Sequence, residues 1–214
     1  MPEIIETTVY QLSELSPSVR EKARDWYREG GFDYDGYSAT FDDFERICDM
    51  LDIRLKTHAV RLYSGRTRDV SSIWFTGFWC QGDGACFEGS YAYAAGAARA
   101  IRTYAPKAEK LHAIADMLQA VQRRNFYQLC ADIRHSGRYY HEYTMLVTVE
   151  RDSPSGQAMT SNAETTIVEA LRDLARWLYR QLETEHEYLN SDEVVDETIA
   201  ANGYTFTEAG RRFG

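Results

Sequence analysis

Residues 72–93 constrain the fold more than any other part of this sequence. Two runs rich in aromatic residues and glycine flank Gln-Gly-Asp-Gly at residues 81–84. Short glycine- and aspartate-containing sequences between such runs are typical of β-hairpin turns. We therefore predict an antiparallel hairpin with its turn at residues 81–84. The segment places a sheet in the core but supplies no obvious catalytic group.

The remaining segments predict further strands, and helices that follow one another in pairs between the hairpins. Strands are expected at 4–10 and 53–63, a polar loop at 64–69 and a second hairpin from 127–134 and 143–151. Helices are expected after Ser16, Thr40, residue 94, Pro106, the capping box Ser161/Glu164 and Ser191. This order predicts an α+β fold: an antiparallel sheet built from two hairpins plus N-terminal strands, with helices packed on it. With 214 residues and no evident linker, we expect a single globular domain over residues 1–214.

The net charge of −9 is unevenly distributed along the sequence. Residues 1–54 carry 6 Lys+Arg against 13 Asp+Glu, and residues 151–214 carry 6 against 12, whereas residues 55–150 carry 12 against 8. An acidic protein repels nucleic-acid phosphates unless a local basic patch overcomes the field. The composition therefore disfavours direct nucleic-acid binding and favours a basic protein partner.

The sequence also indicates a compartment. No secretory signal is visible at the start of the sequence, and there is no run of eighteen apolar residues that could span a membrane. The four cysteines show no CxxC spacing and are expected to be reduced thiols. We therefore expect a cytoplasmic protein.

The cysteines suggest two kinds of chemistry. Cys80 and Cys86 flank the predicted turn and could face one another, but no further ligands with zinc spacing lie nearby, so we expect no metal and no cofactor. A thiolate nucleophile would need a base. Cys86 with His135 or His141 is a conceivable pair, and a Cys/His-dependent enzyme is kept as an alternative. Either Asp83 or Glu88 could supply the carboxylate that orients the imidazole.

Arginines recur every four residues in the longest predicted helix, at Arg172, Arg176 and Arg180. Such a stripe could bind nucleic acid together with tyrosines that stack on bases. Carboxylates within one helical turn of the stripe favour the simpler explanation, which is ion pairing on the helix surface.

Carboxylates near the C-terminus form the sharper candidate for a binding surface. The dipole at a helix N-terminus partly explains Asp192 and Glu193, whereas Glu183 and Glu187 lie near the C-terminal end of a helix and gain no such help. Unpaired carboxylates there suggest Lys and Arg of a partner as their counter-ions. The predicted partner-binding carboxylates are Glu183, Glu185, Glu187, Asp192, Glu193, Asp196 and Glu197. An acidic and aromatic run has a composition suited to a protein interface and adds Asp33, Tyr34, Asp35 and Tyr37.

Four fragments, at residues 15–28, 75–90, 118–127 and 189–197, resemble a family of small phage and prophage proteins. Its members often carry the label of antitoxin of a toxin–antitoxin stability system. The resemblance spans nearly the whole chain, which implies one intact domain, and it implies no catalytic residue.

Small acidic proteins of mobile elements commonly act by binding a host protein. We therefore predict a non-enzymatic inhibitor, such as an anti-CRISPR protein that docks on a basic Cas subunit and occludes its nucleic-acid site in the bacterial host cell. An antitoxin that neutralises a basic toxin is the alternative. It is less favoured because antitoxins usually carry a DNA-binding arm for autoregulation, and the sequence shows no evident one.

Overall fold

The computed structural model describes residues 6–30 and 34–214, which fall into two compact units. Unit 1 combines the two ends of the chain, residues 1–38 and 184–214, and unit 2 comprises residues 39–183. That the whole chain behaves as one domain stays a prediction. Within the described residues, no helix is both long enough and apolar enough to cross a membrane.

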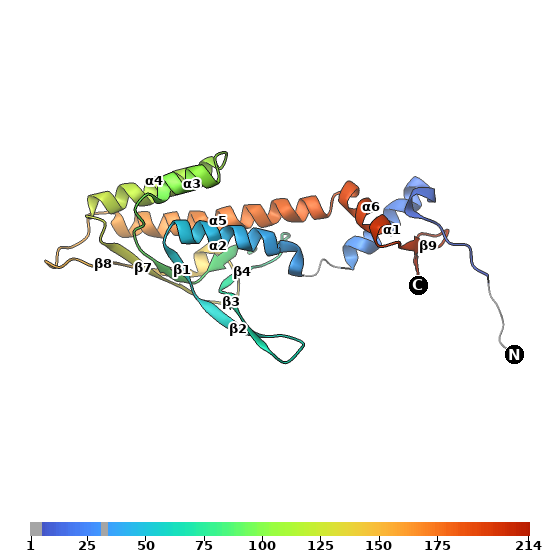
Figure 1. Ribbon diagram of the computed structural model, residues 1–214, viewed down its shortest axis with the longest axis horizontal. Helices are drawn as coiled ribbons and strands as arrows, with labels where there is room; N and C mark the ends of the chain where they lie inside the picture. The colour runs from blue at the N-terminus through green and yellow to red at the C-terminus, as the bar shows by residue number, and fades with distance from the viewer. Residues whose placement is uncertain (1–5, 31–33) are drawn as a thin grey trace. The chain divides into compact units, whose positions relative to one another are not determined.

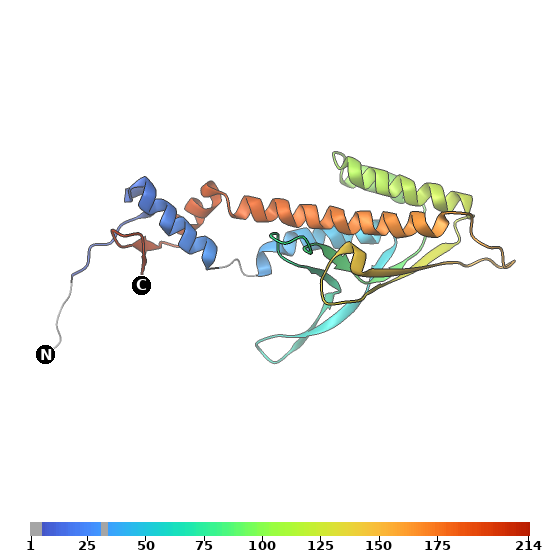
Figure 2. The ribbon, with the colours of Figure 1, turned by 180° about the vertical axis from the view of Figure 1, so that it is seen from behind.

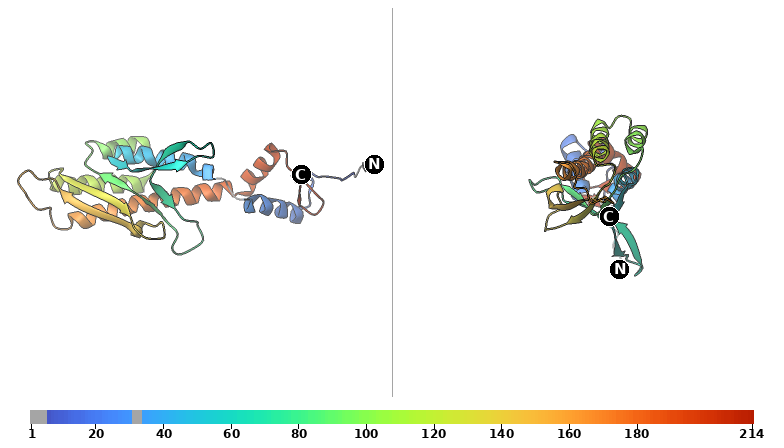
Figure 3. Two further views of the ribbon diagram at one scale, coloured as in Figure 1. Left: turned by 90° about the horizontal axis from the view of Figure 1, so that it is seen from below. Right: turned by 90° about the vertical axis from the view of Figure 1, so that its left-hand side faces the viewer.

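Unit 2 is an α+β unit with helices on one face of an antiparallel sheet, as the sequence predicted (Figure 1). Seen from below, the strands lie in front of the helices (Figure 3). The sheet order is β1 (Ile53–Leu55), β6 (Gly89–Tyr91), β7 (Leu129–His135), β8 (Met145–Arg151). The helices are α2 (Ser38–Met50), α3 (Ala97–Tyr104), α4 (Glu109–Arg124) and α5 (Ala163–Leu189), of which α5 passes into unit 1 at residue 184.

Alternation along the strands decides which side of the sheet is covered. In β7, Leu129, Ala131 and Ile133 are buried, while the side chains between them are at least partly exposed. In α5, apolar residues recur every three or four positions, and this face is buried from Ala163 to Leu182. Its predicted inner residues are fully buried: Ile167, Leu171, Leu174, Leu178 and Leu182.

The predicted aromatic hairpin is confirmed, with shorter strands and a longer turn. β4 (Ile73–Phe75) pairs antiparallel with β5 (Ala85–Phe87), leaving residues 76–84 as the connection. Asp83 shapes this loop, because its Oδ2 accepts hydrogen bonds of 2.7 Å from the backbone N–H groups of Trp79 and Cys80. These two bonds lower the pKa of the Asp83 carboxyl from its usual value.

The single strand predicted at 53–63 is wrong, because the chain changes partner at Lys56. β1 pairs with β6, whereas β2 (Thr57–Arg61) pairs with β3 (Thr67–Ser71), so the predicted polar loop at 64–69 contains the start of a strand. Lys56 marks the switch: its N–H donates to the Glu88 carbonyl, and its own carbonyl accepts from Ser72.

Gly89 allows β1 and β6 to approach closely. A Cβ built on this glycine would lie 2.4 Å from the carbonyl oxygen of Arg54. A glycine inside a strand is typical of such a close approach between backbones.

Unit 1 is built around two helices, α1 (Pro17–Glu29) and α6 (Asp192–Ala201), with short pairing between β9 (Thr205–Phe206) and β10 (Arg212–Phe213). Of the strand predicted at 4–10, residues 4 and 5 lie outside the described residues, and of residues 6–10 only Tyr10 pairs, through an isolated bridge to Phe206. The core of the unit consists of Leu12, Leu15, Ala23, Val195, Ile199 and Phe206.

Three predicted helix starts have different outcomes. Ser191 caps α6, with its side chain accepting from the Val194 N–H. Thr40 lies inside α2, which begins at Ser38. The predicted capping box at Ser161 and Glu164 is not formed, because α5 begins at Ala163. The residue directly before this helix is Asn162, whose φ is 65°.

Candidate functional site

Two of the predicted partner-binding carboxylates already have partners within unit 1. Arg24 Nε lies 2.7 Å from Asp196 Oδ1 and Arg24 also binds Asp192, while Arg28 Nη2 lies 2.6 Å from Asp192 Oδ1. Hydrogen bonding to Arg24 holds the pKa of Asp196 below its ordinary value of 3.8. These carboxylates therefore tie α6 to α1, which local sequence spacing could not reveal because the partners are more than 160 residues apart.

Glu183 is also paired, by Arg180 one turn earlier in α5. The expectation that it lacks a counter-ion is therefore wrong. The i,i+3 spacing of this pair is visible in the sequence and is typical of a helix-surface ion pair.

Four predicted carboxylates remain without a recorded cation partner among the residues that the structure describes. Glu193 and Glu197 are exposed, one turn apart on α6, and at this spacing like charges repel by about 0.2–0.5 kcal/mol. The other two are Glu187, which is exposed, and Glu185, which is half-buried at the end of α5.

The acidic and aromatic run contributes less than predicted. Asp33 lies outside the described residues; Tyr34 and Asp35 begin the 3-10 helix η2 (Tyr34–Tyr37). Tyr37 is buried, and its hydroxyl lies 3.0 Å from Nδ1 of His186 in α5, so it packs inside unit 1 rather than facing a partner. Burial raises the pKa of Tyr37, with a further contribution from Glu185, and lowers the pKa of His186.

The division into units separates the charge of the molecule. Unit 1 holds 6 Lys+Arg against 15 Asp+Glu, whereas unit 2 holds 18 of each. The net charge of −9 therefore belongs entirely to unit 1, although that unit has fewer than half as many residues as unit 2.

The cysteine candidates are not arranged as a nucleophile site. Cys86 is fully buried in β5 opposite Trp74, while Cys80 is exposed in the loop, so the two do not face one another. Burial raises the pKa of Cys86 to about 12, which keeps the thiol protonated at neutral pH.

The candidate bases have other contacts. His135 packs against Trp74, and its backbone N–H donates to the Glu88 side chain at 2.8 Å. His141 Nδ1 lies 2.9 Å from Glu142 Oε2. The His141 ring packs against Gly84, because a Cβ added to this glycine would lie 2.7 Å from His141 Cδ2. Within the described residues, both histidine side chains therefore have contacts with groups other than a thiol.

The arginine stripe of α5 is neutralised within unit 2. Arg172 Nη1 lies 3.0 Å from Glu169 Oε1, and Arg176 Nε lies 2.9 Å from Glu142 Oε1. With Arg180 bound to Glu183, each arginine has a carboxylate partner. Ion pairing, the simpler explanation offered by the sequence, is confirmed.

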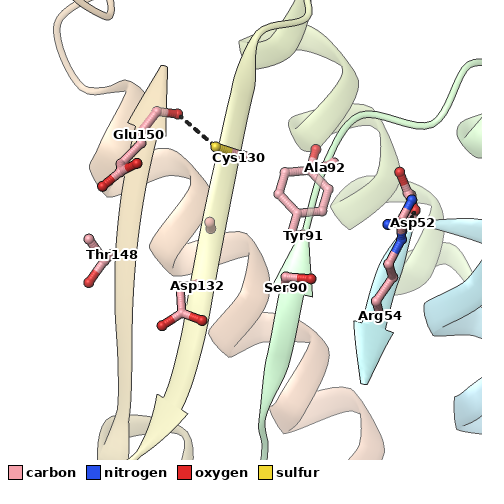
Figure 4. A pocket seen from close by; sticks show the side chains of 10 residues that line it. Asp52, Arg54, Ser90, Tyr91, Ala92, Cys130, Asp132, Thr148 and Glu150 are labelled. Atoms are coloured by element: carbon pink, nitrogen blue, oxygen red, sulfur yellow. Dashed lines mark hydrogen bonds and ion pairs between the residues drawn. The ribbon is translucent and has the colours of Figure 1, made fainter. Parts of the chain in front are cut away.

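The solvent-facing side of the sheet has a hollow of about 340 Å³ (Figure 4). Asp132 is paired with Arg134 at 2.5 Å, and Cys130 Sγ lies 3.7 Å from the Glu150 carbonyl. The pKa of Cys130 is raised by burial and by Glu150. Residues 6–30 and 34–214 contain no cluster of three His, Cys, Asp or Glu side chains suited to a metal ion. The hollow is lined by polar groups from all four strands, including Arg54, Ser90, Asp132 and Thr148.

Comparison with known proteins gives a family but no function. The model of a family described as "Domain of unknown function (DUF8835)" matches residues 37–192. No curated protein and no solved structure matches the chain significantly.

Proposed function

We propose that this chain, which belongs to the DUF8835 family of domains of unknown function, is a non-catalytic binding protein that docks on a basic protein surface through unit 1. The observation that carries the proposal is the concentration of the whole net charge of −9 in unit 1. A surface of one sign attracts a partner of the opposite sign and raises the association rate.

The internal ion pairs of unit 1 support this proposal by providing a fixed framework. Arg24 and Arg28 use Asp192 and Asp196 to hold α1 against α6. The next face of α6 then presents Glu193 and Glu197 to solvent, where they destabilise the helix slightly by mutual repulsion. Lysine or arginine side chains of a partner would relieve this repulsion on binding.

The finer proposal concerns the partner. The resemblance to small phage proteins favours an inhibitor of a host-defence system, which acts in the bacterial cytoplasm and occupies a basic Cas surface that otherwise binds nucleic acid. Carboxylates at such a surface compete directly with phosphates, so inhibition would need no catalytic group.

A tagged pull-down tests the proposal, using lysates that express candidate CRISPR–Cas complexes, with and without nuclease. We expect a stoichiometric Cas subunit that survives nuclease treatment. Recovery of a small basic toxin would keep the binding role but replace the partner. Recovery of only nuclease-sensitive material would contradict docking on a protein.

Charge reversal then locates the surface. The variant E185K/E187K/E193K/E197K should lose the captured partner while its thermal unfolding remains close to that of the wild type. A control with the same change in net charge reverses four exposed carboxylates of unit 2: D42K/D49K/E150K/D152K. Equal loss of binding in both variants would show a general charge effect and would count against a docking surface on unit 1.

A further inference from the structure

β2 and β3 form a two-stranded arm that extends away from the sheet, on the side opposite the helices (Figure 2). Every residue from 59 to 70 is exposed, and Tyr63, next to the tip, is fully exposed. The arm therefore adds no buried apolar surface to the core of unit 2. Packing of the core does not explain why the chain forms this ribbon.

The arm is the basic part of a unit that has no net charge. Residues 57–71, which form the arm, contain three arginines, Arg61, Arg66 and Arg68, against one carboxylate, Asp69. Within the part of the chain that the structure describes, Arg61, Arg66 and Arg68 form no ion pair, whereas each arginine of the α5 stripe has a carboxylate partner. Three cations on an exposed ribbon are thus left for an external anion.

Strand register places these cations on both faces of the arm. Arg61 lies opposite Thr67, and Val60 lies opposite Arg68. Because successive side chains of a strand point to opposite faces, Arg66 and Arg68 share one face while Arg61 lies on the other.

The root of the arm is held by aromatic packing. The His58 ring stacks on Trp74 with centroids 5.5 Å apart, and Trp74 stacks on Tyr140 at 5.7 Å. His58 Nδ1 also lies 3.3 Å from the Ser72 hydroxyl. These contacts fix the direction of the arm, which lowers the entropy cost of ordering it on a ligand.

We propose that the β2–β3 arm binds in the major groove of duplex DNA. A five-residue strand is about 17 Å long, and the major groove of B-form DNA, about 12 Å wide, accommodates a two-stranded ribbon. The long arginine side chains of an inserted ribbon reach the phosphates that border the groove. The deep, narrow major groove of duplex RNA excludes such a ribbon.

The apolar side chains of the arm fit the same ligand. Val60 and Val70 lie on the face of Arg68 and are each 38% exposed, and in the groove they could contact thymine methyl groups. Pairing with the arm of a second copy is less favourable, because it would bring uncompensated arginines of two arms together.

Fluorescence anisotropy of a labelled 20-base-pair DNA duplex tests the proposal over a range of salt concentrations. The variant R61S/R66S/R68S should weaken binding on the order of 100-fold at 0.1 M salt and reduce the salt slope by about 3. The matched control R99S/R123S/R124S removes three exposed arginines elsewhere in unit 2 and should bind like the wild type. R61K/R66K/R68K should restore the salt slope, because phosphate contacts need charge rather than guanidinium geometry.

Several outcomes would overturn the proposal. One is equal weakening in the arm variant and its control, and another is wild-type affinity in the arm variant. Equal affinity of the wild type for duplex RNA or single-stranded DNA of the same sequence would exclude the groove. A change of oligomeric state in the arm variant without a change in DNA affinity would assign the arm to self-association. The proposal concerns another unit and another ligand than the docking of unit 1, so that docking is tested separately. A DNA-binding arm would, however, remove the reason for which an antitoxin is less favoured as the finer function.

Discussion

Arg24 links the two helices of unit 1 through its pairs with Asp192 and Asp196. Its side chain is only 14% exposed, and Arg24→Ala leaves Asp196 without its cation and Asp192 with Arg28 alone. We expect the free energy of unfolding at pH 7 to fall by about 1–3 kcal/mol, measured by urea denaturation. Arg99→Ala, at an exposed position in unit 2, should change it by less than about 0.5 kcal/mol.

The pH dependence of this stabilisation follows from Asp196. Because its folded pKa lies below the ordinary value of 3.8, its contribution is present above that pH and is lost as pH falls through the folded pKa. The stability difference between the wild type and Asp196→Asn should therefore narrow as pH falls below about 4. Urea unfolding midpoints of the two proteins at pH 7, 5, 4 and 3 measure this stability difference. A difference that stays constant down to pH 3 would argue that the ion pair is not its source.

Thiol reactivity tests the assignment of Cys86 as a core residue. Its pKa of about 12 and full burial should make it inert to iodoacetamide at pH 8, whereas the exposed Cys80 should react readily. Mass spectrometry of alkylated peptides, before and after unfolding in urea, distinguishes the two. Alkylation of Cys86 in the native protein as fast as that of Cys80 would reopen the cysteine-enzyme alternative.

At the scale of elements, the close contact of β1 and β6 depends on Gly89. Gly89→Ala would place a methyl group 2.4 Å from the Arg54 carbonyl, and backbone atoms cannot move aside as a flexible side chain can. We expect a loss of about 1–3 kcal/mol in the free energy of unfolding. The control is Gly82→Ala in the exposed β4–β5 loop, where no atom lies within 4 Å of the added Cβ, and it should have little effect.

Elements that bury one face were predictable, and elements without a buried face were not. The apolar spacing of α5 and the alternation in β7 appear in the sequence because each packs one side into the core. The β2–β3 arm has no buried face, so its sequence predicts only the continuation of a strand and a loop. The candidate site divides in the same way. The pair Arg180–Glu183 is local, whereas Arg28–Asp192 exists only once the ends of the chain meet in one unit.

At the scale of the whole molecule, the two candidate surfaces relate differently to the family. The match over residues 37–192 includes the whole arm and Glu185 and Glu187 of the proposed docking surface, but it ends before Glu193 and Glu197. The arm therefore belongs to the segment that defines the family, and Glu193 and Glu197 belong to its flank. DNA binding by the arm should therefore be tested in several members of the family. Docking through α6 should be tested in this chain first.

The division into two units itself makes a prediction about cooperativity. Phe206 is fully buried in the core of unit 1, with its ring centroid 5.8 Å from that of Trp26, so Phe206→Ala should destabilise this core by about 3–5 kcal/mol. If the units unfold separately, hydrogen exchange measured by mass spectrometry will show lost protection in residues 6–30 and 190–214, with residues 109–183 still protected. The reciprocal variant, Ile133→Ala in β7, should open unit 2. Loss of protection throughout the chain in Phe206→Ala would instead establish the single cooperative domain that the sequence predicts, because removing one core would then unfold the other.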